Sequence, residues 1–254
     1  MIFDTHTHYD DEAFEEDRDA LISSLSAKNV GLVVNVGASL SSCRETLRMA
    51  EKYPFVYGAI GVHPSETAEL NEDNFLQLSE MAKHAKCVAV GEIGLDYYWP
   101  EPDRETQKFW FKRQLGLARE LNLPVVIHSR DAANDTITVM KDMHAEEIGG
   151  VIHCFSYTRE TAEVFLKMGF YIGIGGVVTF KNARKIKEAV EVIPLERIVL
   201  ETDCPYLAPV PFRGERNSSL NLPYVIEEIA RIKQVSPNEV EEITWENAHK
   251  LYRL

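Results

Sequence analysis

The sequence has no apolar run close to the ~20 residues that a membrane-spanning helix requires. Its opening stretch, MIFDTHTHYDDEAFEED, is acidic, whereas a secretory signal is basic and then apolar. We therefore expect a soluble protein that works in the cytoplasm and has no membrane partner. No feature of the sequence indicates an obligate protein partner either.

Cysteine is scarce and lacks the spacing of a metal or redox motif. The four cysteines, Cys43, Cys87, Cys154 and Cys204, include no CxxC pair. Two of them follow apolar runs that are typical of strands. We therefore expect buried free thiols in a reducing compartment, not a disulfide framework or a structural zinc site.

Basic residues are also in short supply. The chain has 27 Lys and Arg against 40 Asp and Glu, a net charge of -13. This charge excludes non-specific coating of nucleic acid, so a phosphate-rich partner needs a local positive feature. No linker, repeat or shift in composition divides the 254 residues, and we expect a single domain over residues 1–254.

Eight short apolar runs alternate with helical patterns. We expect these runs, rich in Val and Ile, to be strands of about 4 to 8 residues. They begin near Ile2, Leu32, Phe55, Cys87, Pro124, Val151, Phe170 and Arg197. Such alternation is typical of closed parallel barrels, so the predicted fold class is α/β, a single TIM (β/α)8 barrel. A doubly wound open sheet is the alternative, but polar residues at the strand ends favour the barrel.

Two helix starts are indicated by capping signals. Ser42 with Glu45 has the spacing of a capping box. Ser236, Pro237 and Glu239 combine an N-cap serine, a proline at the first helical position and a glutamate that closes a second box. We expect a helix to begin at each.

Residues of metal-ligand type follow six of the predicted strands. In a parallel barrel these ends lie on one face, so side chains that are remote in sequence converge there. The residues are His6, His8, His63, Glu92, His128, His153 and Asp203. A single His at a strand end is more often a core or surface residue, but the joint occurrence favours metal ligation.

The ligand types indicate a catalytic metal site. His6 and His8 are two residues apart on a strand, so both point to the same side. Imidazoles with carboxylates and no sulfur are typical of a catalytic site, and their number exceeds what one tetrahedral ion uses. We therefore predict two divalent ions about 3.5 to 4 Å apart. Asp4 and Glu201 have the strand parity to lie next to these ligands, where each would accept a ring N–H or restrain a ligand.

Several sequence blocks together resemble the TatD family of metal-dependent hydrolases, within the amidohydrolase superfamily. They occur in family order across nearly the whole chain. The blocks are DTHTHYD, GVHP, GEIGLDYYW, PVVIHSRDA, IHCFS, ETDCPYLAP, PFRGERN and ENA.

The resemblance implies a TIM-barrel deoxyribonuclease, acting as a 3'-5' exonuclease, or a related phosphodiesterase, and a metal-activated water as the nucleophile. It implies metal ligation by His6, His8, Glu92, His128, His153 and Asp203, with Glu92 between two ions. It also implies that His63 contacts the substrate phosphate and that Asp203 orients or deprotonates the attacking water. The residues favour zinc or manganese, whereas the family implies magnesium for several members.

Basic and aromatic residues in loops after strands complete the predicted substrate site. Arg130 and Arg213 supply local positive charge, and Tyr97 flanks the same strand ends. Tyr98, Trp99 and Tyr206 accompany Tyr97, and stacked rings favour DNA ends or single strands over duplex interiors. The aromatic residues fit equally well as a plug of the barrel mouth.

Two other functions stay open from the residues. The same barrel and His-x-His pattern suit a hydrolase of a small amide, lactone or other ester. Such sites often use a carboxylated lysine between their ions, and Glu92 stands there instead. A non-catalytic binding module is the third hypothesis, which the completeness of the ligand set argues against.

Overall fold

The computed structural model describes residues 1–254 and has the predicted fold class. Eight strands follow one another in chain order within one sheet, and the paired strands are parallel. Thr7 forms a parallel bridge with Cys204, beyond the last strand. This order is that of a (β/α)8 barrel.

Every predicted strand is present and begins within two residues of its expected start. Their lengths vary more than expected, because β4 has 10 residues and β6 and β8 have 3. The strands are β1 (Ile2–Thr7), β2 (Val30–Val36), β3 (Val56–Ala59), β4 (Cys87–Asp96), β5 (Val125–Arg130), β6 (Gly150–Ile152), β7 (Tyr171–Ile174) and β8 (Ile198–Leu200).

Seven helices connect successive strands, and two more follow the last strand. They are α1 (Arg18–Ser24), α2 (Leu40–Lys52), α3 (Glu72–Ala82), α4 (Arg104–Leu121), α5 (Ala133–Asp142), α6 (Arg159–Lys167), α7 (Arg184–Val192), α8 (Leu222–Lys233) and α9 (Pro237–Tyr252). No helix combines the length and the hydropathy of a membrane-spanning segment.

One of the two capping predictions is wrong. Helix α2 begins earlier than expected, because Ser39 has the extended backbone of an N-cap and its hydroxyl accepts a hydrogen bond from the Ser42 amide. Ser42 therefore lies inside the helix. The other helix start is confirmed, since Ser236 caps α9 and accepts a hydrogen bond from the Glu239 amide, whereas the closing of a box by the Glu239 side chain stays a prediction.

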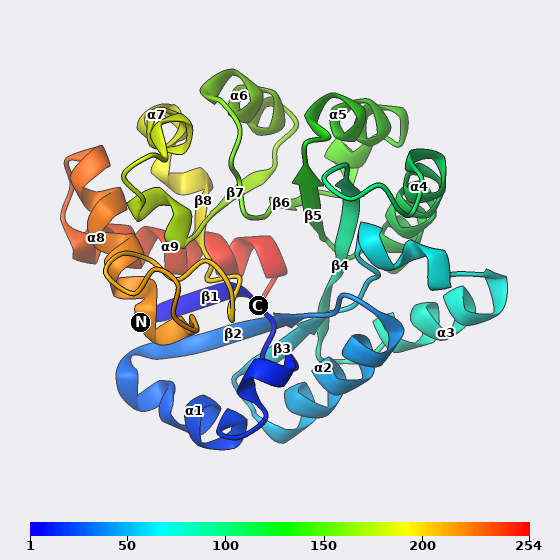
Figure 1. Ribbon diagram of the computed structural model, residues 1–254, viewed down its shortest axis with the longest axis horizontal. Coiled ribbons are helices and arrows are strands. Elements are labelled where there is room, and N and C mark those ends of the chain that lie inside the picture. The colour runs from blue at the N-terminus through cyan, green and yellow to red at the C-terminus, as the bar shows by residue number, and fades with distance from the viewer. The chain divides into compact units, whose positions relative to one another are not determined.

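The chain divides into two compact units, and the description as one domain stays a prediction. The first unit comprises Met1–Asn35, Cys154–Lys167 and Tyr171–Leu254. In it, β1 pairs with β2 and β7 with β8, and α9 packs against β1 and β8 (Figure 1). The buried Asn247 of α9 donates to the carbonyls of Leu195 and Ile198, which fixes the start of β8.

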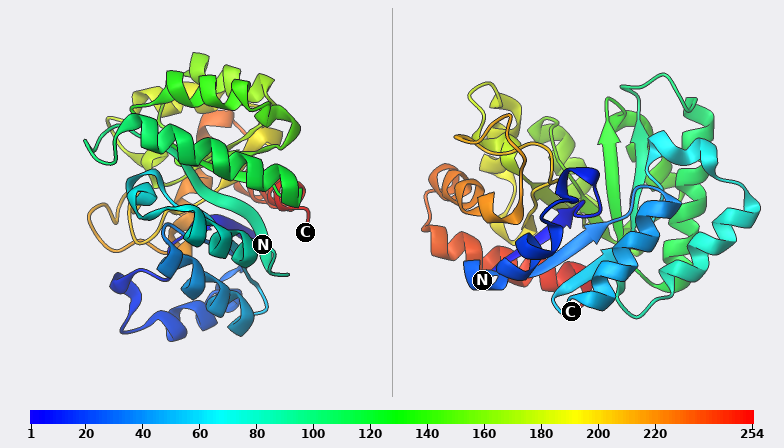
Figure 2. Two further views of the ribbon diagram at one scale, coloured as in Figure 1. Left: turned by 90° about the vertical axis from the view of Figure 1, so that its right-hand side faces the viewer. Right: turned by 60° about the horizontal axis from the view of Figure 1, so that its bottom comes forward.

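The second unit comprises Val36–His153 and Met168–Phe170. Strands β3 to β6 pair in order, and α4 packs along β4 (Figure 2). All ten residues of β4 are buried. A strand covered in this way is expected in a parallel sheet with helices outside.

The prediction of buried free thiols is confirmed for three of the four cysteines. All four thiols are free, and three of them are buried. Cys154 is half-buried. Burial raises the pKa of the Cys87 thiol to about 12, so this thiol is a small apolar core group and not a metal ligand.

Candidate metal centres

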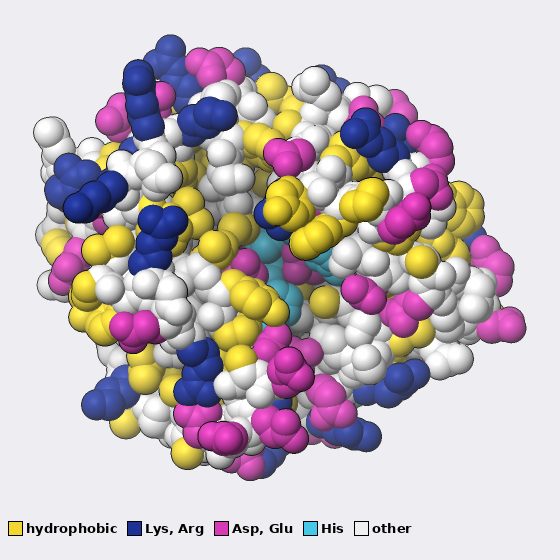
Figure 3. All heavy atoms as spheres, in the orientation of Figure 1, with side chains coloured by type: hydrophobic (Ala, Val, Ile, Leu, Met, Phe, Trp, Pro, Cys, Tyr) yellow, Lys and Arg dark blue, Asp and Glu magenta, His cyan; other side chains and the backbone are white.

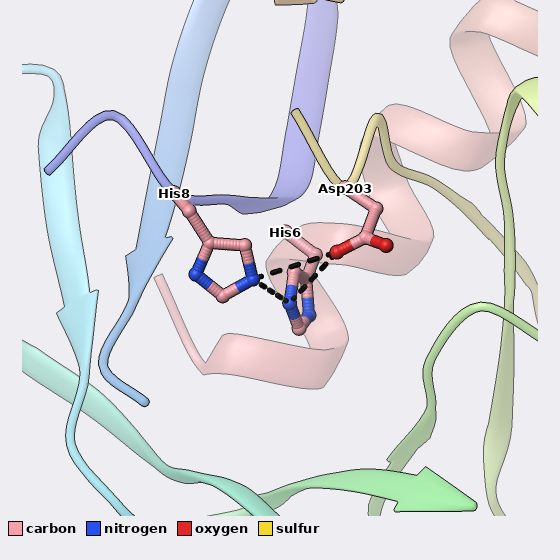
Figure 4. Close-up of side chains that lie close together, drawn as sticks. All are labelled: His6, His8 and Asp203. Atoms are coloured by element: carbon pink, nitrogen blue, oxygen red, sulfur yellow. Dashed lines mark hydrogen bonds and ion pairs between the residues drawn. The ribbon is translucent and has the colours of Figure 1, made fainter. Parts of the chain in front are cut away.

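The first donor cluster lies in the first unit and consists of His6, His8 and Asp203. The Nε2 atoms of His6 and His8 are 3.1 Å apart. The Oδ1 atom of Asp203 lies 3.4 Å from His8 Nε2 and 3.7 Å from His6 Nε2 (Figure 4). The three predicted ligands thus point toward one another, although about 195 residues of sequence separate them.

The backbone brings these residues together. The Asp203 amide donates to the His6 carbonyl at 3.0 Å, and the His8 amide donates to the Cys204 carbonyl at 2.9 Å. Asp203 itself has a φ of 55°, in the left-handed region that non-glycine residues rarely adopt. This turn aims the Asp203 carboxylate at the two rings.

Asp4 anchors the same strand ends from below. Its carboxylate is buried and accepts hydrogen bonds from the Thr202 hydroxyl at 2.8 Å, the Ser219 hydroxyl at 2.7 Å and the Thr202 and His6 amides. Burial raises the pKa of Asp4 to about 7, against the effect of these donors. Asp4 therefore restrains the backbone of His6. The hydrogen bonds to its carboxylate come from amides and hydroxyls, not from a histidine ring.

Glu201 also acts on the backbone. It is buried, and its Oε1 atom accepts a hydrogen bond from the Cys154 amide. Cys154 has a φ of 45°, again in the left-handed region. The carboxylate therefore fixes the turn that follows β6.

The second donor cluster lies in the second unit, around the buried carboxylate of Glu92. Its Oε1 atom lies 2.6 Å from His153 Nε2, 2.7 Å from His128 Nδ1 and 3.7 Å from His63 Nε2. The two nearer ring nitrogens are 3.1 Å from each other. Three predicted histidines therefore converge on one oxygen of Glu92, which is itself a predicted site residue on β4.

Asp96 belongs to this cluster and was not predicted from the sequence. Its Oδ2 atom lies 3.0 Å from His128 Nε2, so the His128 ring is held between Glu92 and Asp96. Burial lowers the pKa of His128, but the hydrogen bonds to Asp96 and Glu92 outweigh it and raise the pKa to about 9. For Asp96, burial raises the pKa and the bond to His128 more than offsets it, so the net shift is downward.

The sequence did contain a signal for Asp96. Glu92, Gly94 and Asp96 alternate along β4, and side chains of one parity share a face of a strand. A glycine is required between the two acids, because a Cβ at Gly94 would lie 1.9 Å from the His128 carbonyl oxygen. The close approach of β5 here places His128 beside both carboxylates.

His63 has a defined ring orientation. Its Nδ1 atom accepts a hydrogen bond from the Ser65 amide at 3.2 Å and lies 2.7 Å from the Ser65 hydroxyl. Burial, followed by the neighbouring His128, lowers the pKa of His63 to about 3. The ring is therefore neutral, with its proton on Nε2, the atom that faces Glu92.

Both clusters have donors that suit a divalent metal ion. Each contains imidazole nitrogens and a carboxylate oxygen, and the three ligand atoms of His6, His8 and Asp203 lie within 4.8 Å of one another, as do those of His63, Glu92 and His128. In each cluster two ring nitrogens lie 3.1 Å apart beside a carboxylate, a set of donors typical of a catalytic metal site.

The predicted substrate-binding residues Arg130, Arg213 and Tyr97 contact other side chains of the protein. The Arg130 guanidinium stacks on the Tyr98 ring at 3.8 Å, and the Arg213 guanidinium lies over Phe180 at 4.5 Å. Tyr97 is half-buried, and its hydroxyl donates to Asp135 at 2.6 Å. The assignment of these residues to substrate binding stays a prediction.

Other basic and aromatic residues at the strand ends are engaged within the protein. Arg216 forms a bidentate pair with Asp17, and the Tyr206 hydroxyl donates to Asp11 at 2.9 Å. On the face drawn in Figure 3, basic side chains are scattered among acidic ones. No broad basic surface offsets the net charge of -13 there.

A (β/α)8 fold with histidine and carboxylate clusters at the ends of its strands defines a metal-dependent hydrolase. The chain belongs to the family described as TatD related DNase, which matches residues 3–253. It is 43% identical to the uncharacterized metal-dependent hydrolase YabD of Bacillus subtilis over the full length of both chains. It is 33% identical to the 3'-5' ssDNA/RNA exonuclease TatD of a Rahnella species, over 95% of this chain and 94% of that protein.

The structure agrees with this membership. It is similar to the crystal structure of YJJV, a TatD homologue of Escherichia coli K12, with a TM-score of 0.93 and 30% identity. The similarity covers 100% of this chain and 98% of the other. The resemblance predicted from the sequence blocks is therefore confirmed, and the chain is an enzyme of the hydrolytic class.

Proposed function

We propose that the protein is a divalent-metal-dependent nuclease that removes nucleotides from the ends of single-stranded DNA, in the 3'-5' direction. The observation that carries the proposal is the convergence of His63, His128 and His153 on the Glu92 carboxylate. The name of the Rahnella relative, an exonuclease of single-stranded DNA and RNA, supports the substrate and the direction.

We propose one divalent ion for each donor cluster, with zinc or manganese preferred by the imidazole ligands over magnesium. His6, His8 and Asp203 would hold one ion, and Glu92, His128 and His153 the other. Divalent ions bound there would supply Lewis acidity, polarising a phosphoryl oxygen and making water acidic enough to yield a nucleophile near neutral pH.

The side chains of the protein have distinct roles in this proposal. Asp203 accepts the proton of the attacking water, since its carboxylate is only partly covered, with 17% of the side chain exposed. His63 donates from Nε2 to a phosphate oxygen, because Ser65 holds the proton on that nitrogen. Arg130 and Arg213 neutralise phosphate charge, and Tyr97 contacts the substrate beside them.

We also propose a cytoplasmic location. Four free thiols in one chain support a reducing compartment.

The test is hydrolysis of end-labelled single-stranded DNA, double-stranded DNA and RNA by the metal-reconstituted protein. We expect divalent-ion-dependent release of nucleotides, fastest from single strands. His128→Ala and Asp203→Ala should each lower the rate about 100-fold or more. His144→Ala is the matched control, because His144 is 68% exposed and contacts neither cluster.

Two results would contradict the proposal. Normal turnover by either variant would remove its assigned residue from the reaction. Faster hydrolysis of small amides or lactones than of any nucleic acid would make the protein a hydrolase of those substrates.

A further inference from the structure

The loop between β4 and α4 presents two exposed aromatic side chains on a fixed backbone. Tyr98 and Trp99 are each 54% exposed, and their rings meet edge to face with centroids 4.8 Å apart. Large aromatic residues are usually buried in a soluble protein, so an exposed pair on one loop indicates a binding surface.

A single buried side chain closes this loop. Gln107 accepts a hydrogen bond from the Asp96 amide at 2.9 Å and donates to the carbonyls of Asp96 at 3.0 Å and Pro102 at 2.8 Å. Gln107 is 1% exposed. Both ends of the segment that carries Tyr98 and Trp99 are therefore held before any ligand arrives, which lowers the entropy cost of binding.

The loop is also joined directly to the second donor cluster. Asp96 Oδ1 accepts a hydrogen bond from the Tyr98 amide at 2.9 Å, while Asp96 Oδ2 contacts the His128 ring. The Tyr97 amide donates to the Arg130 carbonyl at 2.9 Å, which continues the pairing of β4 with β5. The exposed aromatic pair thus begins two residues from a carboxylate that touches a predicted metal ligand.

A planar cation completes the surface. The Arg130 guanidinium stacks on the Tyr98 ring at 3.8 Å, and no carboxylate forms an ion pair with it. Arg130 is exposed, so its N–H groups can reach a ligand. A stacking surface beside a guanidinium matches a nucleotide, which has a flat base and an anionic phosphate.

Tyr97, by contrast, is engaged within the protein. The Arg104 guanidinium lies over the Tyr97 ring at 4.2 Å, and the Tyr97 hydroxyl donates a hydrogen bond to Asp135.

We propose that Trp99, supported by Tyr98, stacks an unpaired nucleobase next to the second donor cluster, and that Arg130 binds the adjoining phosphate. This inference rests on the proposed nuclease function and assigns its substrate to strands with unstacked bases, because a base inside a duplex has no free face for Trp99.

The kinetic test compares two single-stranded DNA substrates of equal length, one normal and one with abasic sugars at its last three positions. Trp99→Ala should raise the KM of the normal strand about tenfold and leave that of the abasic strand unchanged. Phe109→Ala is the matched control, because Phe109 is an exposed aromatic residue of α4 outside the loop, and it should change neither KM. Equal effects of Trp99→Ala on both substrates would overturn the proposal.

A binding measurement separates this proposal from the nuclease function. A phosphorothioate oligo(dT) strand, which resists cleavage, should quench the tryptophan fluorescence of the metal-loaded protein. The quenching should disappear in Trp99→Phe, because Trp110 is buried and the third tryptophan, Trp245, lies on α9. Quenching that persists in Trp99→Phe, or its absence in the wild type, overturns the stacking site. Failure of the wild type to cleave any strand overturns only the nuclease function.

Discussion

Asp96 sets the orientation of the His128 ring, a predicted metal ligand. Its carboxylate lies 3.0 Å from His128 Nε2, which leaves Nδ1, the nitrogen 3.1 Å from His153 Nε2, to face the ligand cluster. A carboxylate behind a histidine ligand fixes the tautomer and orientation of the ring and increases its basicity. Asp96 therefore holds the ring of a predicted metal ligand in place.

We expect Asp96→Asn to lower zinc affinity about 10- to 100-fold, because a neutral amide supports the His128 ring less well than a carboxylate. The Tyr98 amide keeps an oxygen acceptor in this variant, so the loop should stay in place. Competition titration with a chelator measures the affinity. Asp135→Asn, which alters a nearby carboxylate that bonds Tyr97 and Lys108, should bind zinc as the wild type does. Equal affinity of Asp96→Asn and the wild type would contradict the role.

The site residues that could be predicted from the sequence are those that follow a predicted strand. Each residue predicted as a ligand falls into one of the two clusters, because parallel strands bring the ends of consecutive runs to one edge. Asp96 was not predicted as a site residue, because β4 was expected to end near Glu92 and in fact continues four residues further. The left-handed backbone of Asp203 and Cys154 has no signal in composition or periodicity.

Helix α4 positions two of the strand ends at once. Gln114 accepts from the Val62 amide at 2.8 Å and donates to the Val62 carbonyl at 3.1 Å, directly before His63. Gln107 lies seven residues earlier, two turns along the same face, and makes the equivalent bonds to Asp96. Two buried amides on one helix thus set the backbone beside His63 and His128.

Gln114→Ala should lower the free energy of unfolding by about 2 kcal/mol or more, because it leaves a buried backbone donor and acceptor unsatisfied. Urea denaturation followed by circular dichroism measures the change. Gln77→Ala, on the exposed face of α3, should stay within about 0.5 kcal/mol of the wild type. A similar small change in Gln114→Ala would mean that water or a shifted backbone satisfies Val62.

The strands and helices could be predicted where their apolar residues recur regularly in the sequence. The residues at which they begin and end could not be predicted in the same way. The eight strands follow from runs of apolar side chains, most of which are buried. The start of α2 was misjudged because several serines there are able to cap a helix. Only the extended backbone of Ser39 decides between them.

At the scale of the whole molecule, each compact unit contributes its own donor cluster. His6 and His8 meet Asp203 within the first unit, and Glu92 meets His63, His128 and His153 within the second. Each cluster combines ends of different strands, so neither exists in an unfolded chain. We therefore expect metal binding to be coupled to folding in both units.

Metal analysis of single variants tests the assignment of one ion to each cluster. We expect two equivalents of zinc per chain in the wild type and in His144→Ala, and about one equivalent in His8→Ala and in His128→Ala. Elemental analysis after dialysis against dilute zinc provides the count.

Chelation should also destabilise the fold. Each bound ion stabilises the native state by about 2.7 kcal/mol when free metal is 100 times its Kd. The drop in Tm on chelation should therefore be larger for the wild type than for either depleted variant.

The metal count also has outcomes that would contradict the assignment. If His8→Ala or His128→Ala loses both ions, the clusters do not bind metal independently. An unchanged count in a variant would instead remove that histidine from the ligands, whatever its effect on hydrolysis.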